Sequence, residues 1–271
     1  MVDGAAATVT AFRRLHERGT FVMPNPWDAG SAVMLERMGF PALATTSAGS
    51  AWTAGRPDGR LSLDATLAHL RAVVDAVAVP VNADFEGGFA DEPEGVAANV
   101  LAAVATGVAG LSIEDASGDP DRPLHDVELA VDRVAAARAA IDASGSGIVL
   151  TARSEGFVVG RPDLDETLRR LRAYADAGAD CLYAPRVSTV AEVVAIVDAV
   201  APKDVNLLVN APFITVAEAE AIGVRRISVG GTLARAAWGG WLETAREIAE
   251  HGTFGGFAAL PDVEGLLRER P

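Results

Sequence analysis

Residues 80–89 read PVNADFEGGF, in which an apolar approach is followed by polar side chains and two glycines. Asn82, Asp84 and Glu86 crowd the end of a segment that begins like a buried strand. A core cannot hold such groups unpaired, because burying a charge without a partner is far more costly than burying an apolar group. The segment therefore predicts a strand that ends at the mouth of a site.

Similar segments recur along the 271-residue chain. Their Val, Ile, Leu and Ala residues are nearly continuous, as in parallel strands covered on both faces, and longer amphipathic stretches separate them. The eight runs are FVMPN at 21–25, PALATTS at 41–47, VPVNAD at 79–84, AGLSIED at 109–115, GIVLTARS at 147–154, ADCLYAP at 179–185, NLLVNAP at 206–212 and RRISVGG at 225–231. Eight strands alternating with helices predict an α/β fold, a (β/α)8 TIM barrel, better than an open doubly wound sheet.

We expect residues 1–271 to form a single barrel domain. Residues 1–20 predict an N-terminal helix that caps the bottom of the barrel. The stretch at 232–250, TLARAAWGGWLETAREIAE, is apolar and contains two tryptophans. Residues 232–271 are therefore expected to form C-terminal helices at a subunit interface, in a homodimer or homotetramer.

The formal net charge of -14 argues against nucleic acid or an anionic membrane surface as a partner. The single cysteine, Cys181, allows no intrachain disulfide and is expected to be buried. The N-terminal residues lack the layout of a signal peptide, and no apolar stretch reaches the ~20 residues that span a bilayer. These features predict a cytoplasmic protein.

Polar residues lie at the ends of several predicted strands, which in a barrel meet at one mouth. They are Thr45, Thr46, Ser47, Asn82, Asp84, Glu114, Asp115, Arg153 and Asn210. Converging carboxylates repel one another unless a cation lies among them, and oxygen ligands without a His or Cys cluster select Mg²⁺ or Mn²⁺ over zinc. The planar fork of Arg153 suits a carboxylate in two-point contact. The pattern therefore predicts a site for a small anionic molecule chelated to a metal.

Two long irregular stretches, at 48–61 and 115–126, follow strand ends and are expected to form lids or walls of the site. Trp52 is expected to pack in the first of them. We expect the small residues of TTSAG at 45–49 to let backbone N–H groups approach an anionic end of the ligand. Glu86 is expected to cap the helix that follows it, and Asp115 to cap a helix or support the site.

Together these motifs resemble the isocitrate lyase and phosphoenolpyruvate mutase superfamily, in order from about Phe21 to Glu250. The matching stretches are PNPWDAGSA, TTSAGSAW, GRPDG, NADFEGGF, IED and ARSEGF. The resemblance implies a (β/α)8 barrel whose eighth helix swaps between subunits. It also implies chemistry that makes or breaks a C–C or P–C bond next to a carboxylate, through a Mg²⁺-bound enolate.

The resemblance further implies roles for individual residues. Asp58, Asp84 and Glu114 would form the metal shell, directly or through water. Arg153 would bind the substrate carboxylate, and Thr46, Ser47 and Ala48 its keto-acid end. Asn210 is expected from its place at a strand end, and not from the resemblance, either to contact the substrate or to bind the loop backbone. Asn82 belongs to the same metal set but stands where many members have Asp, so we expect weaker metal binding or another direct ligand. Asp58, Glu114 and Arg153 are the expected catalytic residues.

The loop DASGDPDRPLHD at 115–126 lacks cysteine and lysine. It therefore differs from the Lys-Lys-Cys-Gly-His-like loop of the lyases for isocitrate and methylisocitrate. It also lacks the lysine and Asn-Ser-like pair of the mutase and of phosphonopyruvate hydrolase. What remains resembles the branch that acts on 2-oxo acids, namely oxaloacetate-type decarboxylases and lyases of substituted malates. His125, Asp58 or water would protonate the enolate.

Two alternatives stay open. One is a mutase or hydrolase of a phosphonate or carboxyphosphonate. The other is a catalytically quiet homologue that binds a 2-oxo acid but has lost its general acid.

Overall fold

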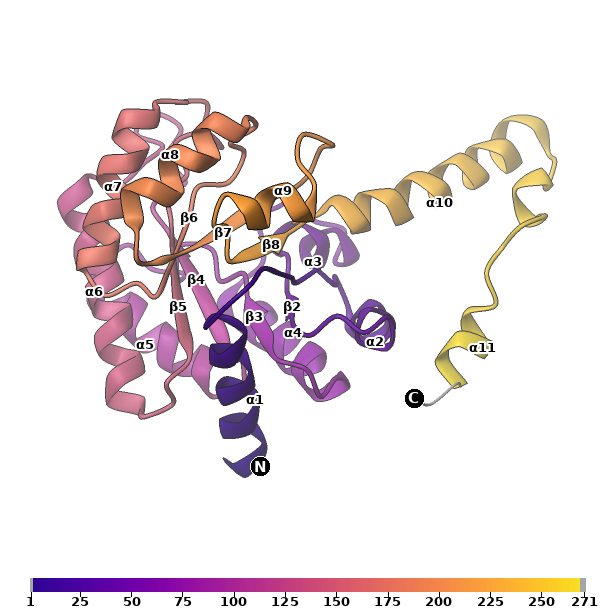
Figure 1. The fold of residues 1–271 in the computed structure, drawn as a ribbon. Helices are drawn as coiled ribbons and strands as arrows, with labels where there is room; N and C mark the ends of the chain where they lie inside the picture. Colours follow the sequence, from indigo (N-terminus) through magenta and orange to yellow (C-terminus); the bar gives the residue numbers. More distant parts are fainter. Residues whose placement is uncertain (1, 269–271) are drawn as a thin grey trace.

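The apolar runs form eight short parallel strands that curl into a (β/α)8 barrel in the computed structural model, which describes residues 2–268 (Figure 1). The strands are β1 Phe21–Val22, β2 Leu43–Ala44, β3 Val81–Ala83, β4 Gly110–Glu114, β5 Val149–Arg153, β6 Cys181–Tyr183, β7 Asp204–Leu208 and β8 Arg226–Ser228. They pair in the order β1-β8-β7-β6-β5-β4-β3-β2. A backbone hydrogen bond from Ala44 N to Pro24 O, 3.1 Å long, joins the two edge strands. The predicted fold class is confirmed.

Strand pairing stops short of the polar ends of the predicted runs. The seventh strand was expected at 206–212 but covers Asp204–Leu208, so Asn210 lies in the following loop. In β4 and β5, by contrast, the ladder extends to the last residues and places Glu114 opposite Arg153. The polar side chains at the mouth therefore come partly from strand ends and partly from the loops just after them.

Helices cover the outside of the barrel (Figure 1). They are α2 Ala29–Arg37, α3 Ser47–Thr53, α4 Leu63–Ala76, α5 Pro93–Val104, α6 Val127–Ser144, α7 Leu164–Asp176, α8 Val190–Val200 and α9 Val216–Ala221. Several begin at a residue whose side chain accepts a hydrogen bond from a backbone N–H of the first turn, such as Asp28, Ser62 and Thr189. Such caps satisfy N–H groups that have no partner within the helix, so they fix where each loop ends.

The N-terminal helix α1, Val2–Leu15, caps the bottom of the barrel as predicted, although it ends before residue 20. Its Phe12 is fully buried, and Arg13 Nη2 donates to the backbone oxygen of Ile148, the residue before β5, at 3.2 Å. A Cβ atom on Gly110 would lie 2.9 Å from the Phe12 ring and 2.6 Å from Asn82 Oδ1. Only glycine leaves room there for the helix to close the barrel.

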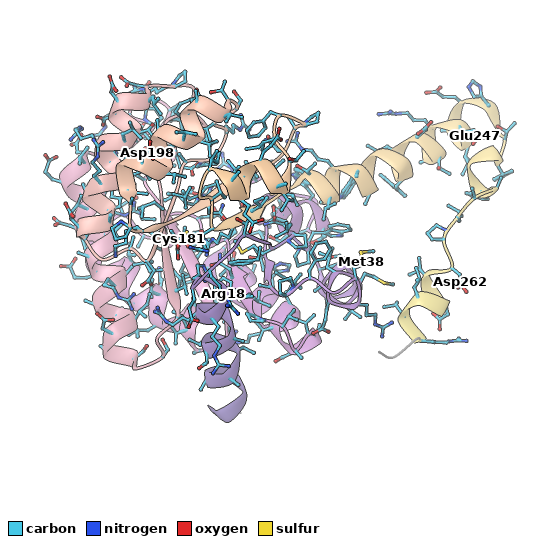
Figure 2. All side chains as sticks on the ribbon, in the orientation of Figure 1. Arg18, Met38, Cys181, Asp198, Glu247 and Asp262 are labelled. Atoms are coloured by element: carbon cyan, nitrogen blue, oxygen red, sulfur yellow. The ribbon has the colours of Figure 1, made fainter. Side chains whose placement is uncertain are left out.

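Helix α10, Thr232–His251, leaves the barrel as an arm that continues through η1, Gly255–Phe257, and α11, Val263–Arg268 (Figures 1 and 2). Large apolar side chains of this arm are exposed to solvent, among them Trp241, Phe254 and Leu260. The swapped helix and the subunit interface stay predictions for this arm. None of the described helices is long and apolar enough to cross a membrane.

Candidate active site

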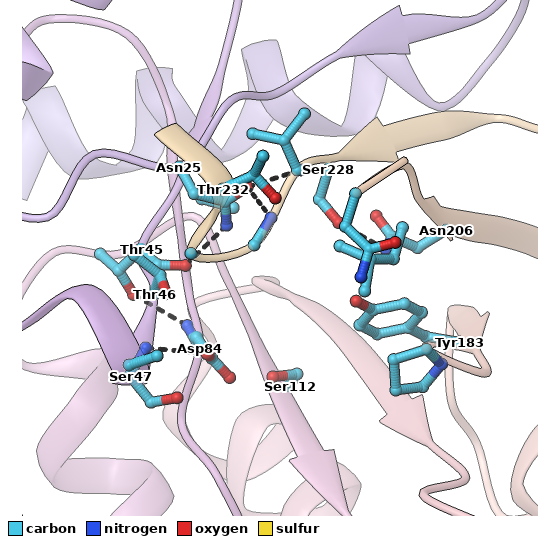
Figure 3. A pocket seen from close by; sticks show the side chains of 18 of the residues that line it. Asn25, Thr45, Thr46, Ser47, Asp84, Ser112, Tyr183, Asn206, Ser228 and Thr232 are labelled. Carbon is cyan, nitrogen blue, oxygen red and sulfur yellow. Dashed lines mark hydrogen bonds between the residues drawn. The ribbon is translucent and has the colours of Figure 1, made fainter. Parts of the chain in front are cut away.

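A cavity of about 270 Å³ opens where the strands end, at the mouth of the barrel (Figure 3). It brings together the residues predicted to bind substrate or metal, except Glu114. They are Thr46, Ser47, Ala48, Asp58, Asn82, Asp84, Arg153 and Asn210. Trp52 also lines the cavity, so the segment at 48–61 forms a wall of the site as predicted, although its residues up to Thr53 belong to helix α3 and are not irregular. The placement of these residues is observed, and their roles remain predictions.

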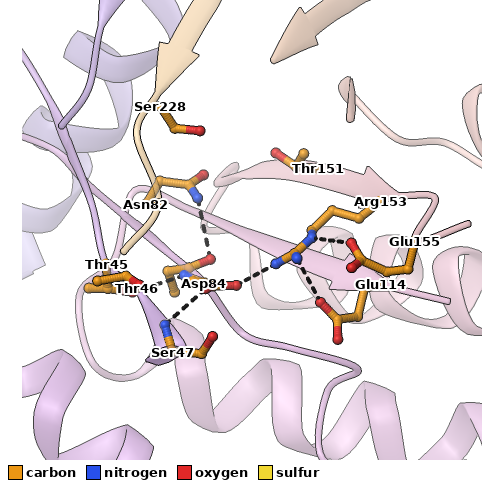
Figure 4. Close-up of polar contacts among 12 residues, drawn as sticks. Thr45, Thr46, Ser47, Asn82, Asp84, Glu114, Thr151, Arg153, Glu155 and Ser228 are labelled. Carbon is orange, nitrogen blue, oxygen red and sulfur yellow. Dashed lines mark hydrogen bonds and ion pairs between the residues drawn. The ribbon is translucent and has the colours of Figure 1, made fainter. Parts of the chain in front are cut away.

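Arg153 lies at the centre of the acidic side of the site (Figure 4). Its Nη1 atom is 2.5 Å from Asp84 Oδ1, and its Nη2 atom is 3.0 Å from Glu114 Oε2. Its Nε atom donates to Glu155 Oε1 at 2.9 Å. The guanidinium of Arg153 therefore holds three carboxylates, from Asp84, Glu114 and Glu155, at the ends of β3, β4 and β5. Glu114 does not line the cavity itself but is linked to it through Arg153.

Asp84 is also held by the start of α3. Its Oδ2 atom accepts a hydrogen bond from the backbone N–H of Ser47 at 2.9 Å, and its own N–H donates to Thr45 Oγ1 at 2.9 Å. The predicted turn at 45–49 is thus the first turn of a short helix whose N-cap is Thr46. The Ser47 N–H, expected to face a ligand, binds Asp84 in this structure.

Glu86 does not cap a helix, and that expectation was wrong. Helix α5 begins at Pro93 with Glu92 at its N-cap, whereas Glu86 lies in a turn with a left-handed backbone at φ 48°. Burial, followed by the negative charges of Asp84 and Asp58, raises the pKa of Glu86 to about 7. Glu86 therefore belongs to the acidic cluster of the site.

The acidic cluster carries more carboxyl groups than its one guanidinium can neutralise. Burial raises the pKa of Glu114 well above its ordinary value and raises that of Glu155, although Arg153 opposes both shifts. Burial also raises the pKa of Asp58, and the charge of Asp84 adds to the shift. Such shifts mark a site that would be stabilised by a further cation.

The donor set suits a hard divalent cation. Within residues 2–268, no three His, Cys, Asp or Glu side chains are already grouped to hold an ion, since Asp84 and Glu114 face Arg153. Mg²⁺, however, keeps several waters and needs only one or two carboxylates. Asn82 lines the cavity and carries a further oxygen, a buried Oδ1 that has no hydrogen-bond partner among the described residues and lies beside Gly110 in this structure, while its Nδ2 donates to Ala83 O at 3.3 Å. Asp84, Glu114, Asp58 and Asn82 therefore fit such an ion in chemical type.

The loop at 115–126 does not line this cavity, contrary to expectation. Its end, including His125, lines a separate cavity with Ser154 and Arg170. His125 thus lies outside the cavity that holds Arg153 and Asp84, whereas Asp58, the other side chain expected to protonate the enolate, lines it. Asp115 caps no helix but supports the site, since its Oδ1 accepts the backbone N–H of Glu155 at 2.7 Å.

Sequence reasoning assigned no role to three residues near the site. Glu155 lies two residues after Arg153 within the quoted ARSEGF, and this spacing was the available signal. Tyr183 ends β6, lines the cavity and lies 5.3 Å from the Arg153 guanidinium carbon, measured to its ring centre. Arg226 is 1% exposed on β8, where its Nε donates to Asn206 Oδ1 at 3.0 Å and its Nη2 to Thr151 Oγ1 at 2.6 Å. Apart from its position inside a predicted strand, nothing in the sequence indicated that Arg226 would be buried near the site.

The fold is a (β/α)8 barrel with an acidic cluster at its mouth, and comparisons with known proteins show the family to which it belongs. The sequence profile described as phosphoenolpyruvate phosphomutase matches residues 12–249. The chain therefore belongs to the isocitrate lyase and phosphoenolpyruvate mutase superfamily. An uncharacterised protein of Mycobacterium tuberculosis is 32% identical over 222 residues, which is 81% of each chain.

Solved structures and named relatives show the range of the superfamily. A protein of Burkholderia cenocepacia J2315, provisionally classed as a lyase or mutase, is 45% identical with a TM-score of 0.94 over 98% of each chain. A phosphonopyruvate hydrolase, solved with oxalate and Mg²⁺, is 27% identical with a TM-score of 0.85, over 96% of this chain and 93% of the other. Other relatives are a 2-methylisocitrate lyase, a 2,3-dimethylmalate lyase and an oxaloacetate decarboxylase. The superfamily thus consists of enzymes with several reactions.

Proposed function

We propose that this protein is a Mg²⁺-dependent carbon–carbon lyase or decarboxylase that acts on a small 2-oxo dicarboxylic acid or a substituted malate. The observation that carries the proposal is the arrangement of Asp84, Glu114 and Arg153 at the ends of three neighbouring strands. This arrangement combines a two-point carboxylate binder with oxygen ligands for a hard cation. The named lyase and decarboxylase relatives support it.

In this proposal, Arg153 binds the carboxylate next to the 2-oxo group through its Nη atoms and orients the bond that breaks. When bound, Mg²⁺ would act as a Lewis acid toward the 2-oxo group, and Mn²⁺ would serve similarly. Asp84, Glu114 and Asp58 would hold it, with Asn82 as a neutral oxygen donor. The walls formed by Thr46, Ser47, Ala48 and Asn210 would enclose the remainder of the substrate, and no covalent nucleophile is needed.

A phosphonate or carboxyphosphonate mutase or hydrolase is the second candidate, because relatives of both kinds match the chain. The loop at 115–126 argues against it, since it has no lysine and does not line the cavity. A quiet binding protein would keep the cavity without turnover.

A substrate panel separates the three. The purified protein with Mg²⁺ would be given oxaloacetate, substituted malates and phosphonopyruvate, and oxalate binding would be measured by calorimetry. Turnover of the first two classes above an Asp84→Ala control supports the proposal, and Asp121→Ala, in an exposed loop, serves as the matched surface control. Phosphonopyruvate cleavage would favour the second candidate, and oxalate binding without any turnover would favour the quiet homologue.

A further inference from the structure

We infer that Glu155 is a positioning residue. It holds Arg153 through Nε and leaves the Nη edge of the guanidinium free to exchange partners with a ligand. The inference rests on the proposed function, because it assumes that Arg153 binds a 2-oxo carboxylate. It concerns a residue with no assigned role, and it explains how an arginine already surrounded by carboxylates can receive another.

The three carboxylates on Arg153 differ in how far they are buried. The Glu155 side chain is 3% exposed, whereas those of Asp84 and Glu114 are 19% and 17% exposed. Glu155 binds the Nε atom at 2.9 Å, and the other two bind the Nη atoms. The more exposed carboxylates are therefore the ones on the edge of the guanidinium that a ligand would use.

Glu155 is itself fixed by a buried chain of contacts. Its backbone N–H donates to Asp115 Oδ1 at 2.7 Å. The other oxygen, Oδ2, accepts from the Tyr174 hydroxyl at 2.6 Å and from Arg170 Nη1 at 3.1 Å. Asp115, Tyr174 and Arg170 are all at most 6% exposed. Because buried, satisfied polar networks are rigid, the network from α7 through Asp115 holds Glu155 in place.

Asp84 and Glu114, in contrast, belong to the set that fits a divalent cation. A cation that attracts them would loosen their contacts with Nη1 and Nη2, and a ligand carboxylate could replace them as a bidentate partner. Such an exchange keeps the guanidinium in place only if a third contact holds it. Glu155 at Nε supplies that contact, so Arg153 would change partners without changing position.

The test measures ligand binding and metal binding separately. Oxalate affinity with Mg²⁺ present would be measured by calorimetry, and Mn²⁺ affinity without oxalate by electron paramagnetic resonance. We expect Glu155→Ala to weaken oxalate binding at least about tenfold, since a misplaced charged hydrogen-bond donor loses about that much. Mn²⁺ affinity should stay within about threefold. Glu155→Gln, which keeps an oxygen acceptor for Nε, should restore most of the oxalate affinity.

Each result bears on the inference. Unchanged oxalate binding in Glu155→Ala overturns it, and so does equal weakening of oxalate and Mn²⁺, which would mean a general loss of the site. If Glu155→Ala does not fold, Glu155→Asp decides by the same criteria, because the shorter carboxylate keeps the charge but is withdrawn from Nε. If wild-type protein binds no oxalate with Mg²⁺, the proposed function fails, and this inference fails with it.

Discussion

Glu114 and Arg153 lie directly opposite each other in the ladder between β4 and β5, and their side chains meet at 3.0 Å. The pairing arises because parallel strands of a barrel end at the same mouth. It places the Glu114 carboxylate in contact with the guanidinium of Arg153, which lines the cavity. Substitution of Arg153 tests what this arrangement does.

The first prediction concerns the fork of Arg153. Arg153→Lys keeps the positive charge but replaces three directed N–H contacts with one flexible ammonium group. Affinity for oxalate in the presence of Mg²⁺ should fall by about 10- to 100-fold, the range for losing a hydrogen bond to a charged group. Calorimetry on this variant and on Arg122→Lys, an exposed arginine paired only with Asp119 among the described residues, checks it. Equal affinities in both variants would disprove the role.

The second prediction concerns Asn82, whose buried Oδ1 lacks a hydrogen-bond partner among the residues that the structure describes. Asn82→Asp adds a charged oxygen ligand, so Mn²⁺ affinity should rise about tenfold because carboxylates hold hard cations more strongly than amides. Without metal the variant should unfold at lower urea concentration, since it buries another negative charge. Asn206→Asp adds the same charge beside Arg226 and should leave Mn²⁺ affinity unchanged. A matched gain in the two variants would show that net charge, and not a ligand, is responsible.

The third prediction concerns pH and stability. Burial and the nearby charge of Arg226 lower the pKa of His16 from 6.5 to about 3. Between these values the unfolded chain binds a proton that the folded chain does not, so stability falls as pH falls through this window. From about pH 7.5 to about pH 5.5, His16 should lower the free energy of unfolding by up to about 1.4 kcal/mol.

His16→Gln removes this titration and keeps groups that can bind Phe12 O and Arg226, the two hydrogen-bond partners of the ring. Urea unfolding at both pH values should therefore show a smaller loss in His16→Gln than in wild type. His251→Gln, at the exposed end of α10, should behave like wild type. The prediction is wrong if all three proteins lose stability in parallel.

The fourth prediction concerns the arm formed by α10, η1 and α11. Trp241 is 59% exposed and packs edge-on against Trp238 at 5.3 Å, which leaves a large apolar surface without a partner in one chain. We propose that a second copy of the chain covers it, in a homodimer or homotetramer. Trp241→Glu should weaken association at least about 30-fold, because buried tryptophans are typical hot spots. Sedimentation velocity checks this against Leu101→Glu on α5, and a monomeric wild type would contradict it.

The barrel was predictable because its strands are apolar on both faces and alternate with helices at regular spacing. Asp84 and Arg153 were predictable as neighbours because both lie at the ends of apolar strands, and these ends share one mouth. The approximate place of β7 was also predictable, but its first and last residues were not. The predicted run at 206–212 continues past Leu208, the last residue of the strand.

Side-chain partners were less predictable, because they depend on loops. Glu86 looked like a helix cap because a helix follows, but the chain turns at a left-handed residue and starts α5 at Pro93. The loop at 115–126 looked like a wall of the site but packs beside a different cavity. Glu155 and Asp115 meet through contacts between two strand ends, and no local pattern specifies such contacts.

The most direct test of the proposed function compares wild type with Asp84→Ala on oxaloacetate, with Mg²⁺ and with a chelator. Oxaloacetate also loses CO₂ unaided, so the variant defines the background. We predict pyruvate formation by wild type with Mg²⁺ at a rate at least about 100-fold above the variant, and a fall to the variant's rate with chelator, since a Lewis acid contributes several kcal/mol. Equal rates in wild type and Asp84→Ala, repeated with substituted malates, would contradict the account.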